Sequence, residues 1–166
     1  MLEFVAGSAA EVFPADMAES IAKIVPSAAA DVYRSEPVDP RGWSQLQSRV
    51  MRTLDAAPQI AGVDAYQSVY VPGSRNGVER VPIPNVADPL EIGSLDSLLA
   101  ELRAFAAKAA LPTDDVELMQ LAAHYLENDA LIDQDLDVQT YVQLMLAAKQ
   151  SAAHGVPLWI AIESVR

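Results

Sequence analysis

The sequence predicts an α+β fold: a mostly helical single domain over residues 1–166 with a small antiparallel sheet. Three observations lead to this class. Apolar residues recur at helical spacing in several segments, and two valine-rich runs flank Pro-Gly and Asn-Gly pairs within residues 64–84. The continuous apolar run VPLWIAI at 156–162 is typical of a buried strand. A chain of this length suits one domain with a substantial core.

The N-terminal region predicts one strand followed by helices over about 14–57. LEFVA, at 2–6, suits a short strand. The apolar positions of 14–25 repeat at helical spacing until Pro26 ends the pattern. Residues 27–37 favour neither helix nor strand, because three alanines are followed by valine and tyrosine.

A better-defined helix follows Asp39. The Asp39 carboxylate can cap its first turn, and Pro40 suits the first helical position, where no N–H is needed. The apolar stripe of this helix consists of Trp43, Leu46, Val50 and Leu54. We therefore expect this stripe in the core, and Trp159 of the C-terminal run is expected to be buried as well.

The next segment predicts a β-hairpin over about 66–83. Asn76 and Gly77 tolerate positive φ and suit the turn, while the prolines of the segment favour a sheet edge. Residues 85–93 are expected to be a connector. The C-terminal strand, about 157–162, is expected to pair with the hairpin or with the N-terminal strand.

Three helices are expected between the hairpin and the C-terminal strand, within about 94–162. Ser94 can cap the first helix, and Thr113 or Asp114 the second. The third helix, about 137–153, is followed by a glycine that suits a left-handed helix end. The expected inward residues are Leu118, Leu121, Ala122 and Tyr125 on the second helix, and Val138, Tyr141, Val142, Met145, Ala148 and Ala152 on the third.

The composition excludes several classes of function. The chain has no cysteine, which excludes thiolate catalysis, iron–sulfur clusters and cysteine-ligated zinc. No run of 18 apolar residues could span a membrane, and the N-terminus has an acid, Glu3, where a secretory signal has basic residues. We expect a soluble cytoplasmic protein, and the excess of arginine over lysine hints at a bacterial source.

Acidic residues are concentrated in one part of the chain. The formal net charge is −12, and no Lys or Arg lies between Lys108 and Lys149. The acids of this interval are Asp114, Asp115, Glu117, Glu127, Asp129, Asp133, Asp135 and Asp137. Such a surface repels nucleic acid and anionic membranes, and it attracts a basic protein partner. The alternative is that the acids serve only solubility.

Three aspartates before the last helix resemble the start of a calcium-binding loop. Asp133, Asp135 and Asp137 would occupy the first, third and fifth loop positions. The sixth position, which requires glycine, is Val138, and the twelfth, which requires glutamate, is Leu144. We therefore expect these aspartates to cap the following helix rather than to bind calcium.

A metal site has little support. His124 and Glu127, at i and i+3 of one helix, are weak metal-ligand candidates, because no second histidine-bearing helix accompanies them. Serine nucleophile elbows and phosphate-binding glycine motifs do not occur, so we predict no cofactor and no catalytic residues.

The sequence thus favours a non-enzymatic interaction protein that binds a basic partner through residues about 114–137. Immunity proteins and secretion chaperones are analogues at the level of class alone. One alternative is a small enzyme that uses carboxylates and His124, with or without a metal. Another is a structural subunit that forms a homodimer or larger assembly through the C-terminal strand or an edge of the 66–83 hairpin.

Overall fold

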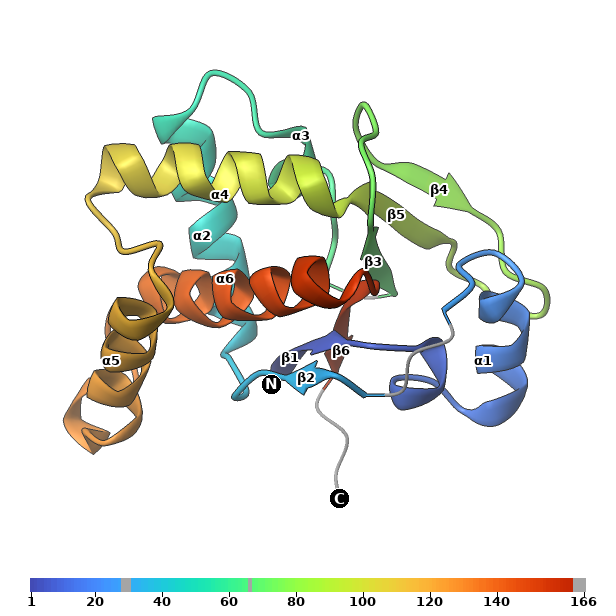
Figure 1. Cartoon of the computed structure of the whole chain (residues 1–166), viewed down its shortest axis with the longest axis horizontal. Coiled ribbons are helices and arrows are strands. Elements are labelled where there is room, and N and C mark those ends of the chain that lie inside the picture. Colours follow the sequence, from blue (N-terminus) through green and yellow to red (C-terminus); the bar gives the residue numbers. More distant parts are fainter. Residues whose placement is uncertain (28–30, 66, 163–166) are drawn as a thin grey trace.

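The computed structural model describes residues 1–27, 31–65 and 67–162, and its described part has an α+β architecture. A mixed sheet of six strands is covered by helices (Figure 1). The strands are β1 (Leu2–Ala6), β2 (Tyr33–Arg34), β3 (Ser68–Val71), β4 (Glu79–Val81), β5 (Leu90–Ser94) and β6 (Leu158–Ile162). The helices are α1 (Ala15–Ala22), α2 (Pro40–Thr53), α3 (Pro58–Ala61), α4 (Leu95–Ala109), α5 (Asp115–Leu126) and α6 (Leu136–His154). Two short 3₁₀ turns are η1 (Ala9–Glu11) and η2 (Asp129–Leu131).

The sheet is larger than predicted, and it is mixed rather than antiparallel. Its strand order is β2-β1-β6-β3-β5-β4, in which β3 and β5 run parallel and the other neighbours run antiparallel. The predicted hairpin over 66–83 is wrong in its pairing, because β5 lies between β3 and β4. Tyr66, at the start of that prediction, lies outside the described residues, as do residues 28–30 of the ambiguous segment.

The strand β5 explains the error. The sequence predicts a connector over residues 85–93, a range that includes most of β5. All five residues of β5 are nevertheless buried, and the strand pairs with β3 on one side and β4 on the other. Gly93 is suited to this position, because a Cβ there would lie 2.5 Å from Gln59 Oε1 and 2.7 Å from the Tyr70 ring. A glycine that sequence patterns assign to a loop here permits close packing in a central strand.

The C-terminal strand is confirmed, and it lies in the middle of the sheet. Leu2 to Ala6 of β1 pair antiparallel with Ile162 to Leu158 of β6, and β3 pairs with the other side of β6. The pairing with the N-terminal strand is therefore confirmed, and the other neighbour of β6 is β3 alone, because the expected hairpin does not form. Because β6 has a neighbour on each side, it offers no open edge to a second copy of the chain.

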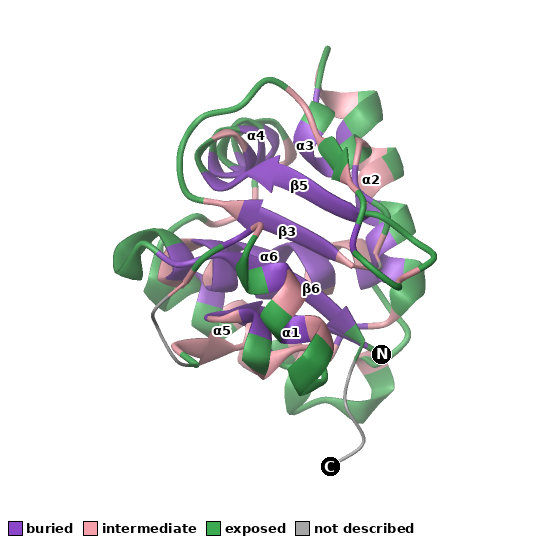
Figure 2. Ribbon diagram, turned by 90° about the vertical axis from the view of Figure 1, so that its right-hand side faces the viewer, coloured by how far each residue is buried: buried purple, intermediate pink, exposed green. Residues whose placement is uncertain are grey.

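The sheet separates two apolar clusters (Figure 2). Alternate residues of each strand point to opposite faces, so Phe4 belongs to the cluster formed with α2, α4 and α6. Trp159 belongs to the other cluster, on the side of α1, where its ring lies 5.5 Å from that of Phe13. Its indole Nε1 donates to the Gly7 carbonyl at 3.0 Å. The predicted burial of Trp43 and Trp159 is confirmed.

The predicted helix starts are confirmed for α2, α4 and α5. Asp39 accepts a hydrogen bond from the Arg41 N–H, Ser94 from the Ser97 N–H, and Asp114 from two N–H groups of α5. Side chains that accept these bonds satisfy donors that the helix itself leaves free. Capping chemistry therefore identified the starts of these three helices.

Buried polar groups join α3, α4 and the sheet. Glu101 of α4 accepts the backbone N–H groups of Gln59 and Ile60 at 2.9 and 3.1 Å, and thereby caps the four-residue helix α3. The Tyr70 hydroxyl donates to the Gln59 carbonyl at 2.8 Å, and Gln59 Oε1 accepts from the Ser94 N–H at 2.7 Å. Burial raises the pKa of Glu101 above its usual value, although the two N–H groups act in the opposite direction.

The last helix, α6, is the centre of the helical layer. It packs against α2, α4, α5 and β1, and ten of its residues are buried. Gly42 of α2 lies against α6 so closely that a Cβ would meet Thr140 Oγ1 at 2.3 Å and the Leu136 carbonyl at 2.6 Å. Ala152, predicted to face inward, is exposed, whereas Leu144 is buried. No helix in the described ranges has the length and apolar character needed to cross a membrane.

Candidate functional site

The eight predicted partner-binding acids lie on α5 and on the segments that flank it. We call residues 114–137 the acidic limb; it comprises α5, the turn η2 and the start of α6. The limb lies at the end of the molecule opposite α1 and away from the sheet (Figure 1). Of α5 only Leu118 is fully buried, and Leu121, Ala122 and Tyr125 are half-buried. The limb is therefore held to the body by one face.

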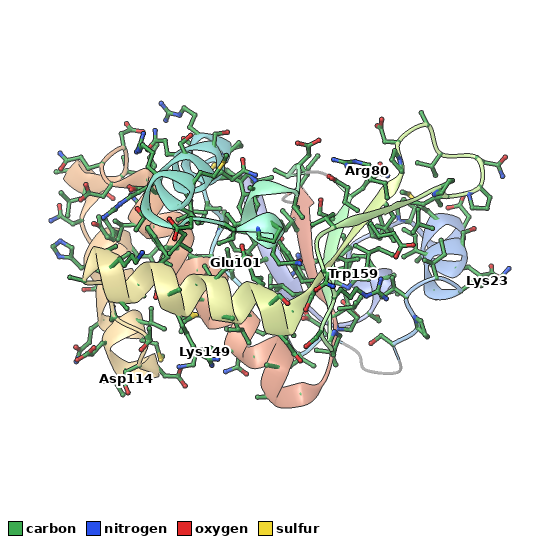
Figure 3. The ribbon with its side chains drawn as sticks, turned by 90° about the horizontal axis from the view of Figure 1, so that it is seen from above. Lys23, Arg80, Glu101, Asp114, Lys149 and Trp159 are labelled. Atoms are coloured by element: carbon green, nitrogen blue, oxygen red, sulfur yellow. The ribbon has the colours of Figure 1, made fainter. Side chains whose placement is uncertain are left out.

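The N-terminal end of the limb is fixed by two residues of α6. Lys149 Nζ lies 2.5 Å from the Asp115 carboxylate and donates to the Thr113 carbonyl at 2.8 Å, close to Asp114 (Figure 3). The Tyr141 hydroxyl donates to the Pro112 carbonyl at 2.6 Å, and burial raises its pKa to about 12. Lys149 therefore holds α5 in place, and its ammonium group is already engaged.

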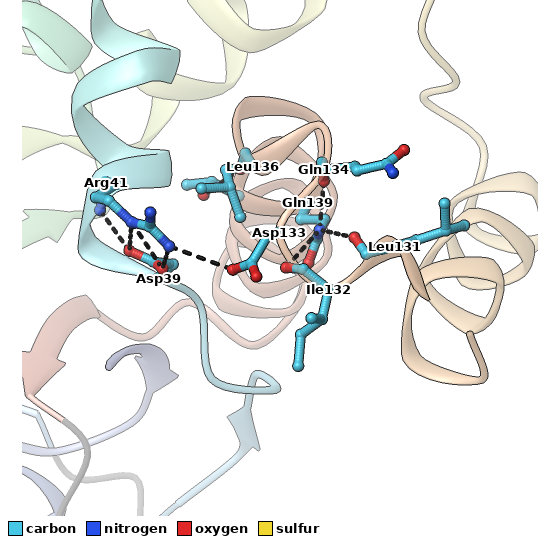
Figure 4. Close-up of polar contacts among 9 residues, drawn as sticks. Asp39, Arg41, Leu131, Ile132, Asp133, Gln134, Leu136 and Gln139 are labelled. Carbon is cyan, nitrogen blue, oxygen red and sulfur yellow. Dashed lines mark hydrogen bonds and ion pairs between the residues drawn. The ribbon is translucent and has the colours of Figure 1, made fainter. Parts of the chain in front are cut away.

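The C-terminal end of the limb is organised by Gln139. Its side-chain amide donates to the carbonyls of Leu131 at 3.2 Å and Gln134 at 2.6 Å (Figure 4). The Tyr125 hydroxyl donates to the Asp135 carboxylate at 2.9 Å, and burial, together with this carboxylate, raises the Tyr125 pKa to about 12. These contacts define the shape of a segment that has little regular secondary structure.

The structure corrects the charge distribution inferred from the sequence. Three of the eight acids form ion pairs with cations from distant parts of the chain. These pairs are Asp115–Lys149, Asp133–Arg41 and Asp137–Arg49, at 2.5, 3.3 and 2.8 Å. Arg41 and Arg49 belong to α2, which approaches α6 only in the folded protein, so sequence distance concealed both pairings.

Two further acids have internal hydrogen bonds, and three project freely. Asp114 caps α5, and Asp135 accepts from Tyr125. Glu117, Glu127 and Asp129 are exposed, and within the described part of the chain no ion pair involves them. They are therefore the acids best placed to meet a partner.

The three aspartates before α6 do not form a calcium loop. Asp133 faces Arg41 (Figure 4). Asp137 faces Arg49, and Asp135 faces Tyr125, so each carboxylate has a different partner. The predicted side-chain capping of α6 is wrong: Asp135 occupies the N-cap position with a left-handed φ of 47° and makes no capping bond. Asp133 and Asp137 instead connect the limb to α2, and Asp135 connects two parts of the limb.

The weak metal candidates are not brought together with further ligands. His124 is exposed on α5, with its ring 5.3 Å from that of Tyr125, and Glu127 follows at the end of the helix. In the ranges 1–27, 31–65 and 67–162, no group of three His, Asp or Glu side chains is placed to hold a metal ion. The His154 imidazole lies 3.0 Å from the Gln150 carbonyl, at the other end of α6.

The acidic limb also has an exposed apolar surface that the sequence interpretation missed. Val116, Met119, Leu126 and Ile132 are 62%, 62%, 55% and 64% exposed. They are four of the seven large hydrophobic residues that are exposed in the described part of the chain. The spacing of Val116, Met119 and Leu126 places them on one helical face. The same spacing is present in the sequence, but the inward residues expected for α5 do not include these three.

Comparison with known proteins does not assign this chain. No protein-family model matches it, and neither the curated proteins nor the solved structures give a significant match. Functional inference therefore depends on the geometry of the site.

A hollow with charged groups lies at the β4 edge of the sheet. It has a volume of about 270 Å³ and is lined by Asp64, Arg80, Asp88, Pro89 and Glu91. Glu91 is buried, accepts from the Asp64 N–H at 2.9 Å, and lies 3.1 Å from Arg80 Nη2. The buried carboxylate thus already has a cation, and the acidic limb is the stronger candidate site.

Proposed function

We propose that this protein binds a basic protein partner through the acidic limb and acts by that binding rather than by catalysis. The observation that supports this proposal is the free projection of Glu117, Glu127 and Asp129 from one exposed helix and its C-terminal turn. The nearby cations Lys149, Arg41 and Arg49 are engaged by other acids. The negative charge of the limb is therefore available to a cation from outside.

The net negative charge of the whole chain also favours a basic partner. A net charge of −12 on 166 residues repels nucleic acid and anionic lipid, and it accelerates encounter with a basic protein. By analogy of class, proteins that neutralise a basic toxin or escort a basic secreted protein have this character. Such a partner would be sequestered as a stoichiometric complex.

Exposed ion pairs contribute little to affinity one by one, about 0.2–1 kcal/mol each. The rate at which a charged partner associates depends on the summed electrostatic field of the surface, so several charges must be changed together to test it. The sequence suggests reversal of Asp133 and Asp135, but both make contacts within the protein. The cleaner variant reverses Glu117, Glu127 and Asp129 to lysine.

The test is affinity capture from native cell lysate at low and high salt, with the bound proteins identified. We expect the wild type to retain a basic protein at low salt and to lose it at high salt. The triple reversal of Glu117, Glu127 and Asp129 should abolish this capture. The matched control reverses three exposed acids elsewhere, Asp16, Glu19 and Asp88, and should retain it.

Two outcomes would contradict the proposal. An empty wild-type capture at both salt concentrations excludes a stable complex. Equal loss of the captured protein in both triple variants shows that binding depends only on net charge, and that the acidic limb is not the binding surface.

A further inference from the structure

The exposed apolar residues of the acidic limb indicate what kind of segment the partner presents. Val116, Met119 and Leu126 are exposed and lie within about 80° of one another around α5, beside the side that carries its buried residue, Leu118. Ile132 is exposed in the turn that follows. The other exposed large hydrophobic residues in the described ranges, Met1, Met51 and Ile162, are distributed over other elements.

The charges around this apolar face indicate the charge of the segment that binds it. Glu127 and Asp129, which form no ion pair in the described part of the chain, follow Leu126 at the C-terminal end, whereas Asp115 beside Val116 already pairs with Lys149. The cations near the limb form ion pairs with other acids. A complementary surface therefore has apolar side chains that cover Val116, Met119 and Leu126, and basic side chains at the end that meets Glu127 and Asp129.

The geometry of the face favours a helix as the complementary element. The apolar residues lie on a helix, whose backbone offers no open strand edge for β-addition. Residues at i, i+3 and i+10 form a ridge along the axis, which fits the groove of a second helix. A helix of 12 residues is about 18 Å long, which corresponds to slightly more than three turns of a facing helix.

We infer that Val116, Met119, Leu126 and Ile132 seat the apolar face of a basic amphipathic helix, whose lysines or arginines meet Glu127 and Asp129. This inference rests on the proposed function and specifies the partner segment. Apolar anchors at the centre of an interface contribute most of its affinity, while the charges at its rim mainly govern association and specificity.

The test uses two synthetic peptides of identical composition, 16 residues of leucine and lysine, one amphipathic as a helix and one scrambled. Binding to the full chain is measured by calorimetry at moderate salt. We expect saturable 1:1 binding of the amphipathic peptide, about tenfold tighter than that of the scrambled one.

Two variants locate the contact. Met119→Ser combined with Leu126→Ser should weaken binding of the amphipathic peptide about tenfold. Met51→Ser, at an equally exposed methionine of α2, should leave it unchanged. All three side chains are exposed, so the variants should fold like the wild type, which circular dichroism and melting curves verify.

The remaining outcomes separate this inference from the proposed function. If both peptides bind equally and only the reversal of Glu117, Glu127 and Asp129 weakens them, the helix inference is overturned and the acidic-surface proposal survives. No binding of either peptide overturns the inference, while the lysate capture decides the proposed function independently. If sedimentation shows a dimer that the Met119 and Leu126 changes dissociate, a second copy covers the face and the inference is overturned.

Discussion

The helices α5 and α6 begin in similar sequence but have opposite places in the molecule. Both follow acidic segments, and both have more apolar residues than one buried face needs. In α6 the surplus is buried, because α2, α4, α5 and β1 surround it. In α5 the surplus, Val116, Met119 and Leu126, is exposed. An apolar surplus on a helix therefore indicates either a central position in the core or a binding face, and only the fold distinguishes them.

The largest expected effect on stability is the difference between two methionine substitutions, one in α6 and one in α5. Met145→Ala in α6 should lower the free energy of unfolding by about 2–5 kcal/mol, because it leaves a cavity at a fully buried position. Met119→Ala in α5 should change it by less than about 0.5 kcal/mol. Urea unfolding followed by circular dichroism measures both. Similar losses for the two variants would show that α5 is packed more closely than described.

The second prediction concerns the contact that makes α6 central. Gly42→Ala should destabilise the protein by about 1–3 kcal/mol, because the added Cβ would overlap Thr140 and the Leu136 carbonyl. In an exposed helix the same change would stabilise by about 1 kcal/mol. Thermal melting shows whether Gly42→Ala destabilises or stabilises the protein. A raised melting temperature would contradict the close approach of α2 to α6.

The third prediction compares a buried carboxylate with the exposed ones of the limb. Glu101→Ala should destabilise by about 1–3 kcal/mol, because it leaves the two buried backbone N–H groups that Glu101 now caps without an acceptor. Unfolding free energies at pH 7 measure this loss. A neutral result would show that the cap of α3 contributes nothing to stability.

The raised pKa of Glu101 also predicts a pH dependence. The unfolded chain ionises this carboxyl first, so the stability that Glu101 contributes is complete below the unfolded pKa and is lost as pH rises through the folded pKa. The difference in stability between the wild type and Glu101→Ala should therefore shrink as pH rises from about 4.5. Unfolding at a series of pH values tests this, and a difference that grows with pH would contradict the direction of the pKa shift.

The smallest expected effect on stability is that of the limb acids. Reversal of Glu117, Glu127 and Asp129 to lysine should change the free energy of unfolding by less than about 0.5 kcal/mol, because these side chains form no ion pairs in the described structure. Reversal of Asp137, which pairs with Arg49, should cost more. Melting curves of the two variants provide the comparison.

Local chemistry was predictable from the sequence, whereas pairing between distant segments was not. Asp39, Ser94 and Asp114 identified helix starts because a cap depends on neighbours two or three residues away. The β3–β5 pairing depends on packing around Gly93 and Gln59, which no local pattern encodes. The acids of the limb were found by sequence, but their pairing with Arg41 and Arg49 required the crossing of α2 and α6.

The central claim is that the acidic limb binds a basic partner, and salt-dependent affinity capture tests it most directly. The wild type and the Asp16, Glu19 and Asp88 reversal should retain the same basic protein at low salt and lose it at high salt. The Glu117, Glu127 and Asp129 reversal should retain none at either. Retention by all three proteins, or by none, would contradict the claim.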